Sequence, residues 1–235
     1  MMRYDRRMFR GRFFAYRRRV TRILIATNIL VYVLVSLAGA LLLSLRGDYV
    51  KAVFALLVPD FTGAIWEVHR IVPIVLQGYE VMYLNRWWEL LTSMFVHANL
   101  LHILFNMLAL KSIGEVTEVT MGTKRMLIAY FLGGLVGGVL TITIAPFMYT
   151  VGASGAIFSI IGLLAMFEYK RFGSMRSINW AIMIFIISSF GFGGEVVNVL
   201  AHIGGLATGL ALGFIWAISI PRIRFEYSHT YYPYT

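Results

Sequence analysis

Ser154 and His202 have the chemistry of a nucleophile and its general base. Ser154 lies in a Gly-Ala-Ser-Gly sequence at the start of an apolar segment, where small neighbours leave its hydroxyl accessible. A histidine that accepts the hydroxyl proton makes such a serine nucleophilic. His202 is followed on its own helix side by Gly205 and Gly209, which favour close packing of a neighbouring helix. Because both side chains are short, a contact between them would require such packing.

His102 and Asn106 are candidate hydrogen-bond donors. They are four residues apart and share one helix face, where two donors can stabilise a developing oxyanion. Hydrogen bonding to a neighbouring helix is the alternative. His97 precedes His102 by five residues, a rotation of about 140° on a helix, so the two histidines are not expected to form a metal pair. The chain has no cysteine, which excludes disulfides and thiolate zinc sites, and neither a metal nor a cofactor is predicted.

The ionisable residues inside the apolar segments are these three histidines. Glutamate is absent from the centres of the segments, and the aspartates lie outside them, at Asp5, Asp48 and Asp60. An intramembrane aspartyl protease needs carboxylates within its spans, and a zinc protease of the HExxH type needs a glutamate beside paired histidines. The sequence therefore argues against both classes.

The composition places this chemistry in a membrane. Of the 235 residues, 59% are hydrophobic and 14% are charged, whereas a soluble domain carries about 25% charged residues. This excludes a soluble globular enzyme and a disordered protein. Backbone groups in lipid must pair internally, so we expect an all-α polytopic membrane protein, a bundle of six transmembrane helices. The predicted spans are 23–45, 93–110, 126–147, 154–168, 178–191 and 200–220.

The connector 46–92 is predicted to be a long amphipathic external loop at the membrane surface. Proline and glycine interrupt it, and its tryptophans and tyrosines suit the headgroup region. Lysine and arginine gather on the side of the amino terminus, which predicts a cell-membrane protein with both termini in the cytoplasm. The inward-facing basic residues of the connectors and tail are Lys111, Lys124, Arg125, Lys170, Arg171, Arg176, Arg222 and Arg224.

Three regions are predicted: a basic cytoplasmic arm 1–22, a membrane domain 23–220 and a tyrosine-rich cytoplasmic tail 221–235. The arm holds nine arginines and could bind nucleic acid or anionic lipid. Since it runs directly into an apolar stretch, we favour a topology signal with lipid contact and no nucleic-acid partner. A cleavable signal peptide is less favoured, because the apolar run of about 23 residues exceeds the usual 7–15.

Residue counts place Ser154 and His202 at similar depth in the membrane. Ser154 precedes the boundary residues Glu168 and Lys170 by about 14–16 residues, roughly 21–24 Å of helix. The hydrocarbon core is roughly 30 Å thick, so Ser154 is expected below the outer surface. His202 precedes the interfacial candidate Trp216 by 14 residues, a similar offset.

Together these residues resemble the rhomboid intramembrane serine proteases, over about residues 23–220. The resemblance rests on four motifs in the family's order: Trp87-Trp88; the run from Leu91 to His102 with Asn106; Gly152-Ala153-Ser154-Gly155; and Ala201-His202-Ile203-Gly204-Gly205. It implies a dyad without a carboxylate, in which Ser154 is the nucleophile and His202 the base. It also implies that His102, Asn106 and the Ser154 backbone N–H are the oxyanion donors.

The resemblance further implies supporting residues and partners. Phe158 would pack against the catalytic imidazole, and His97, Gly152 and Gly155 would be structural. The substrates would be transmembrane proteins in contact with membrane lipids, and they would enter near 178–199. In that region the glycines would permit motion and the phenylalanines could plug the entrance, namely Gly191, Gly193, Gly194, Phe190 and Phe192.

Two positions depart from the family's pattern. Glu89 stands where the family often has an arginine after the tryptophan of the first loop, and Thr120 lies in a Glu118 to Gly122 signature that lacks its arginine. Both are structural positions in the resemblance, so the chemistry is expected to be retained.

The alternative function is a non-catalytic membrane-protein binder or a transporter on the same helices.

Overall fold

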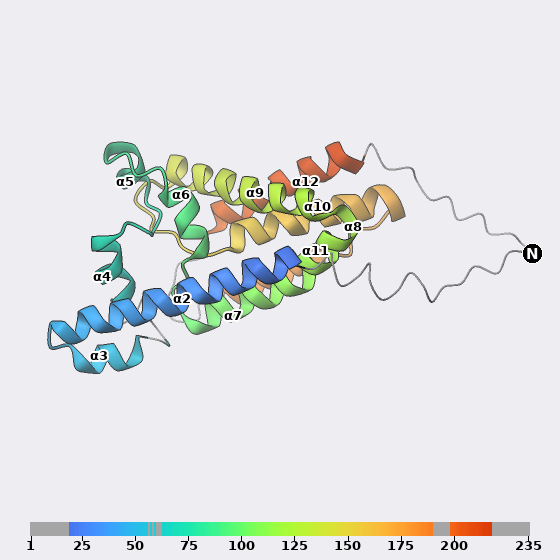
Figure 1. Ribbon diagram of the computed structural model, residues 1–235. Coiled ribbons are helices and arrows are strands. Elements are labelled where there is room, and N and C mark those ends of the chain that lie inside the picture. Colours follow the sequence, from blue (N-terminus) through green and yellow to red (C-terminus); the bar gives the residue numbers. More distant parts are fainter. Residues whose placement is uncertain (1–18, 56, 58, 60–62, 190–197, 218–235) are drawn as a thin grey trace, which may run out of the picture.

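Long helices form one bundle, and the short helices within residues 49–92 gather at one end of it (Figure 1). The computed structural model describes residues 19–55, 57, 59, 63–189 and 198–217. The helices are α2 (Arg19–Leu45), α3 (Tyr49–Phe54), α4 (Ala64–Ile71), α5 (Gly78–Tyr83), α6 (Glu89–Thr92), the 3₁₀ turn η1 (Ser93–Phe95), α7 (Leu100–Ala109), the π turn η2 (Leu110–Gly114), α8 (Glu115–Met121), α9 (Thr123–Ile144), α10 (Ser154–Phe172), α11 (Ile178–Ser189) and α12 (Val199–Ala217).

The predicted all-α membrane architecture is confirmed at this level. Within the described residues four helices are long and apolar enough to cross a bilayer: α2, the continuous helix Leu100–Met121, α9 and α12. The predicted spans 154–168 and 178–191 correspond to α10 and α11, which are helical but do not meet that criterion of length and apolarity. The limits predicted for α2, α9 and α12 lie within four residues of the helix ends, as for α2, which begins at Arg19.

The prediction of a helix over 93–110 was wrong at its beginning. Residues 93–95 form a 3₁₀ turn, Val96 has extended backbone angles, and α7 begins only at Leu100. Asn99 fixes this start, since its side chain accepts a hydrogen bond from the His102 N–H at 2.8 Å. An asparagine at this position satisfies an otherwise unpaired amide, which favours helix initiation here over continuation from residue 93.

The first loop, 46–92, contains α3, α4, α5 and α6. An isolated antiparallel bridge ties it to the segment before α10, where the Leu76 N–H donates to the Thr150 carbonyl at 3.0 Å and the Thr150 N–H donates back at 2.8 Å. Leu76 is buried with Val81 and Ile142 in a small apolar cluster. The loop is therefore packed onto the end of the bundle that holds the start of α10.

Helices α9, α10 and α12 pack closely through glycines. An added Cβ on Gly137 of α9 would lie 2.6 Å from the Ala201 carbonyl oxygen of α12, and one on Gly162 of α10 would lie 2.5 Å from that of Leu206. Such small residues allow helix backbones to approach within a membrane. Most of α10 is buried, with Ile160, Ile161 and Leu163 fully enclosed, so it forms the centre of the bundle.

Glu118 of α8 joins the start of α2 to the rest of the bundle. Its carboxylate accepts hydrogen bonds from the backbone N–H groups of Val20 at 3.1 Å and Thr21 at 3.0 Å. The hydroxyls of Thr21 and Thr123 donate to it at 2.7 and 3.1 Å. The first N–H groups of a helix have no partner within the helix and carry a partial positive charge, so a buried carboxylate is well placed here.

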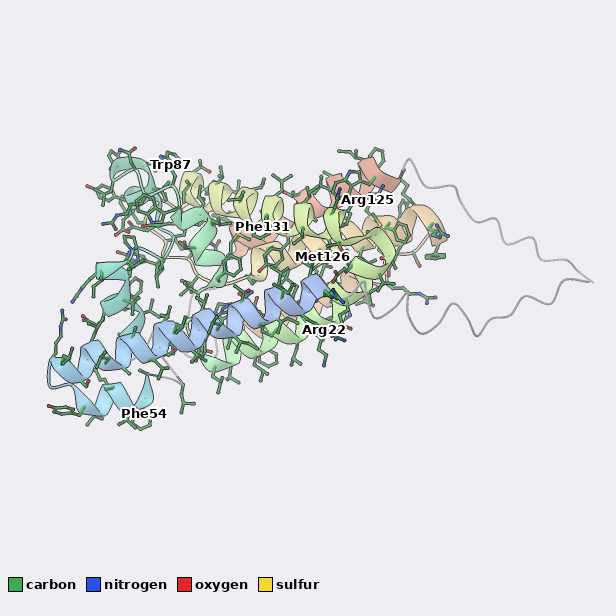
Figure 2. The ribbon with its side chains drawn as sticks, viewed as in Figure 1. Arg22, Phe54, Trp87, Arg125, Met126 and Phe131 are labelled. Carbon is green, nitrogen blue, oxygen red and sulfur yellow. The ribbon has the colours of Figure 1, made fainter. Side chains whose placement is uncertain are left out.

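The two ends of the bundle differ in the residues that they present. Arg22 and Arg125 lie at one end, whereas Phe54 and Trp87 lie at the opposite end with the first loop (Figure 2). Both aromatic side chains are about half exposed. The arrangement separates a basic end, near the starts of α2 and α9, from an aromatic end.

Candidate active site

Ser154 is the first residue of α10 and follows a sharply turned segment. Gly152 has a φ of 117°, which L side chains rarely adopt, and its N–H donates to the Ser93 carbonyl at 2.9 Å. Glycine adopts such angles without steric cost, so the turn can bring the serine to the surface of a cavity. The N-terminus of α10 also leaves unpaired backbone N–H groups beside the Ser154 hydroxyl.

His202 of α12 contacts Ser154 directly. Its Nε2 lies 2.8 Å from the Ser154 Oγ, and the imidazole is 5% exposed. The ring of Phe158, one turn along α10, stacks on the imidazole with a centroid distance of 4.3 Å and an interplanar angle of 8°. The geometry permits proton transfer between hydroxyl and imidazole, while the stacked ring restricts rotation of the base.

A seam of glycines lets these two short side chains meet. A Cβ on Gly205 would overlap the Gly155 carbonyl oxygen, and one on Gly209 would overlap that of Ser159. Gly155 itself faces Ala201, whose carbonyl oxygen would lie 3.2 Å from an added Cβ. The backbones of α10 and α12 are therefore in direct contact on the side of α12 that carries His202.

His102 and Asn106 line the same cavity as Ser154 and His202. The His102 Nε2 is so close to Gly152 that an added Cβ there would lie 2.8 Å from it. Asn106 donates one amide hydrogen to the His102 carbonyl at 2.8 Å, which orients its side chain. An amide carries two hydrogens, so the second one can serve another acceptor.

The cavity has a volume of about 840 Å³ and extends beyond the four polar residues. One wall comes from α7 and α11, including Phe105, Leu108, Trp180 and Met183. Another comes from the first loop and the segment before α10, where the rings of Trp66 and Tyr149 make an edge contact at 4.8 Å. A cavity of this size with a mainly apolar lining can hold several side chains of a polypeptide.

The helical rotation of about 140° predicted between His97 and His102 was wrong. Their rings make an edge contact with a centroid distance of 5.2 Å. The helical rotation does not apply, because His97 precedes α7 in non-helical backbone. His97 is buried behind His102 and packs against its imidazole.

A second polar cluster was missed by the sequence analysis. Ligand atoms of His69, Glu80 and Glu89 lie within 4.8 Å of one another in the first loop. The His69 Nδ1 accepts hydrogen bonds from the N–H groups of Ile74 and Val75 at 3.0 and 3.1 Å, so Nε2 must carry the proton of the neutral ring. That Nε2 then donates to Glu80 at 2.9 Å. A metal-bound histidine normally has its other nitrogen as a donor, so the cluster does not fit a metal.

Glu89 is the unusual member of this cluster. It is fully buried, and the Arg86 guanidinium lies 3.8 Å from its carboxylate and 2.9 Å from that of Glu80. Burial, together with the negative charge of Glu80, raises the pKa of Glu89 to about 7. The departure of this position from the family's arginine was the signal that could have marked it.

Several predicted residues lie outside the described part of the chain. They are residues 1–18 of the basic arm, Asp5 and Asp60, the entrance residues Phe190, Gly191, Phe192, Gly193 and Gly194, and the tail 221–235.

Comparisons with known proteins all point to one family. A family model described as Rhomboid domain matches residues 84–219. The chain is 39% identical over 130 residues to "Rhomboid protease GluP" of Bacillus subtilis (strain 168), covering 53% of this chain and 25% of that protein. It is 35% identical over 135 residues to "Rhomboid-like protease 3" of Toxoplasma gondii, covering 53% of this chain and 50% of that protein. It is 33% identical over 160 residues to "RHOMBOID-like protein 2" of Arabidopsis thaliana, covering 66% of this chain and 50% of that protein. The chain thus spans half or less of the length of these three relatives.

Proposed function

Since this chain belongs to the rhomboid family, we propose that it is an intramembrane serine protease that hydrolyses peptide bonds in or near transmembrane segments of other proteins. The observation that carries the proposal is the 2.8 Å contact between the Ser154 Oγ and the His202 Nε2 at the floor of a large cavity. Relatives named as proteases support it.

The proposed reaction begins with proton transfer from Ser154 to His202. The imidazole accepts the proton on Nε2 only when Nδ1 carries the other hydrogen, and among the described residues His202 Nδ1 has no hydrogen-bond partner. Serine–histidine pairs of this kind usually have a carboxylate that orients the base. Here stacking on Phe158 would take over that orienting role.

The Ser154 oxygen would then attack the substrate carbonyl and form a tetrahedral intermediate. His102, Asn106 and the Ser154 backbone N–H would stabilise its oxyanion, since donors that point at developing charge contribute most to such catalysis. His202 would give its proton to the departing amine, which leaves an acyl-enzyme. A water molecule deprotonated by His202 would release the second product and regenerate the serine.

The proposal includes an orientation in the membrane. We place α10 and α11 as the remaining two of six spans, with both termini in the cytoplasm of a cell-membrane protein and the first loop outside. The charge distribution of the sequence supports this orientation. The separation of Arg22 and Arg125 from Phe54 and Trp87 at opposite ends of the bundle supports it as well (Figure 2). Substrates would be transmembrane proteins, and lipids would surround the bundle.

Cleavage of a single-span substrate with a small residue near a helix breaker tests the proposal. The purified chain should cleave it in detergent and in liposomes, and Ser154→Ala and His202→Ala should abolish cleavage. Ser44→Ala is the control, because Ser44 lies at the end of α2 and, among the described residues, its hydroxyl bonds within its own helix to the Leu41 carbonyl. His102→Ala should lower kcat about 100-fold, the usual effect of losing one oxyanion donor.

Two outcomes would count against a protease. One is cleavage that survives Ser154→Ala. The other is a wild-type chain that cleaves none of several substrates and whose Ser154 does not react with a fluorophosphonate, which would favour the alternative of a non-catalytic binder or transporter.

A further inference from the structure

Asn198 uses its whole side-chain amide to join three parts of the molecule. Its Nδ2 donates to the hydroxyl of Thr141 on α9 at 2.9 Å and to the hydroxyl of Thr150 at 2.8 Å. Its Oδ1 accepts from the backbone N–H of Ala201 in the first turn of α12 at 3.0 Å. The Thr141 hydroxyl donates to the Gly137 carbonyl of its own helix at 2.9 Å, so it is free to accept from Asn198.

In the sequence, Asn198 precedes His202 by the same number of residues as Thr150 precedes Ser154. Asn198 is four residues before His202, and Thr150 is four residues before Ser154. The His202 N–H also donates to the Asn198 carbonyl at 3.3 Å, so the base lies one helical turn from the amide. The Asn198–Thr150 hydrogen bond therefore connects the two segments that carry nucleophile and base, four residues before each of them.

The glycine seam alone does not fix this contact. Glycines set how closely α10 and α12 approach, but their contacts are not directional, so they resist sliding or rotation of one helix along the other only weakly. Hydrogen bonds have preferred lengths and angles and restrict both motions. Thr150 is itself held by its bridge to Leu76, which gives the Asn198 amide a fixed partner.

We propose that Asn198 is a positioning residue, which holds the first turn of α12 against Thr141 and Thr150 so that the His202 imidazole stays within hydrogen-bonding distance of Ser154. This inference rests on the proposed protease function. Displacement of a catalytic group by about 1 Å can lower the rate about 100-fold, so a small shift of α12 is expected to matter.

Asn198→Ser separates the positioning role from ordinary helix capping. Serine caps a helix about as well as asparagine, but its hydroxyl is too short to reach both threonines. We expect Asn198→Ser to lower kcat roughly 10- to 100-fold with KM changed less than about threefold. The rate of fluorophosphonate reaction at Ser154 should fall in proportion, because this small probe reports on the dyad without an extended substrate.

Threonine variants provide a second test that does not alter α12. Thr150→Val and Thr141→Val each remove one partner of the amide and should lower kcat and the probe rate less than Asn198→Ser does. Thr143→Val is the matched control, because the exposed Thr143 hydroxyl bonds only to carbonyls of its own helix, at 2.8 and 3.0 Å. It should retain wild-type kinetics.

Three results would overturn the inference, and each is distinct from failure of the proposed function. Wild-type activity in Asn198→Ser would reduce Asn198 to a helix cap. A raised KM with an unchanged probe rate would make it a substrate contact. Wild-type activity in both threonine variants would show that neither link matters. If the wild-type chain neither cleaves nor reacts with the probe, the proposed protease function itself fails.

Discussion

Two buried glutamates at different places in the molecule have opposite surroundings. Glu118 is 1% exposed and its carboxylate accepts four hydrogen bonds from Val20, Thr21 and Thr123. Glu89 is 0% exposed, but among the described residues neither of its carboxylate oxygens has a well-formed hydrogen bond. Burial alone therefore does not determine the surroundings of a carboxyl group, because the donors and charges that it contacts differ from one buried site to another.

The difference follows from what each glutamate faces. Glu118 faces the N-terminus of α2, where unpaired amides and the helix dipole favour a negative charge. Glu89 faces a second carboxylate, Glu80, and shares Arg86 with it. His69 Nε2 donates to Glu80, while its Nδ1 accepts two backbone hydrogen bonds. Burial and the charge of Glu80 therefore raise the pKa of Glu89.

Removal of the Glu118 carboxylate should have the largest effect on stability. Glu118→Ala leaves two backbone N–H groups and two hydroxyls of a buried region without their acceptor, and each unpaired group costs about 1–3 kcal/mol. Partial relaxation reduces the sum, so we expect a loss of about 2–4 kcal/mol. Thermal unfolding in detergent measures it. The control is Glu115→Ala on the same helix. Glu115 forms an ion pair with Arg22 at 3.7 Å, and its removal should lower the stability by under about 1 kcal/mol. An equal loss in the two variants would contradict the assigned role of Glu118.

Removal of Arg86 should have the next largest effect, and the effect should depend on pH. Arg86→Ala leaves Glu80 and Glu89 without their shared cation, which we expect to cost about 1–2 kcal/mol at pH 8 and less at pH 5. The control is Arg70→Ala, since Arg70 is 64% exposed and pairs with Glu67 at 3.1 Å. It should change stability by under about 0.5 kcal/mol at either pH. A loss at Arg86 that is the same at both pH values would exclude titration of this cluster.

Glu89→Gln is the one change of the three that should stabilise the protein. The pKa of Glu89 rises from 4.5 to about 7 on folding, so between these values the folded state binds more protons than the unfolded state. Stability then falls as the pH rises through this range. Glutamine resembles the protonated acid, so the variant should match wild type near pH 4.5 and be more stable than wild type at pH 8. Unfolding curves across this range measure the difference. A variant less stable than wild type at pH 8 would mean that Glu89 is ionised and paired in the folded state.

Features encoded locally in the sequence were largely predictable. The length and polarity of the apolar segments predict helices, and the first residue of α10 agrees with the predicted limit at Ser154. Counts of residues from the helix ends placed Ser154 and His202 at similar depth, and the structure brings their side chains into contact. These inferences need only a helical rise and the thickness of a bilayer.

Features that depend on distant partners could not be predicted in this way. Glu118 contacts residues 97 and 98 positions earlier, and Asn198 contacts residues 48 and 57 positions earlier, so helical periodicity carries no signal for either. His97 was assigned to a helix because its neighbours are apolar, whereas the Asn99 cap starts α7 after it. Polar contacts across the bundle decided the first two cases, and a local helix cap decided the third.

The π turn between α7 and α8 has a consequence for how the length of this helix can vary. Such turns occur within α-helices as a single widened turn that takes up an additional residue, so the α-helical parts on either side keep their own facing directions. Ahead of the turn Asn106 faces the cavity, and behind it Glu118 faces α2. A continuous α-helix with the same number of residues would rotate one of these side chains by about 100°. The widened turn thus allows the direction of Asn106 toward the cavity and that of Glu118 toward α2 to change independently, although one continuous helix carries both residues.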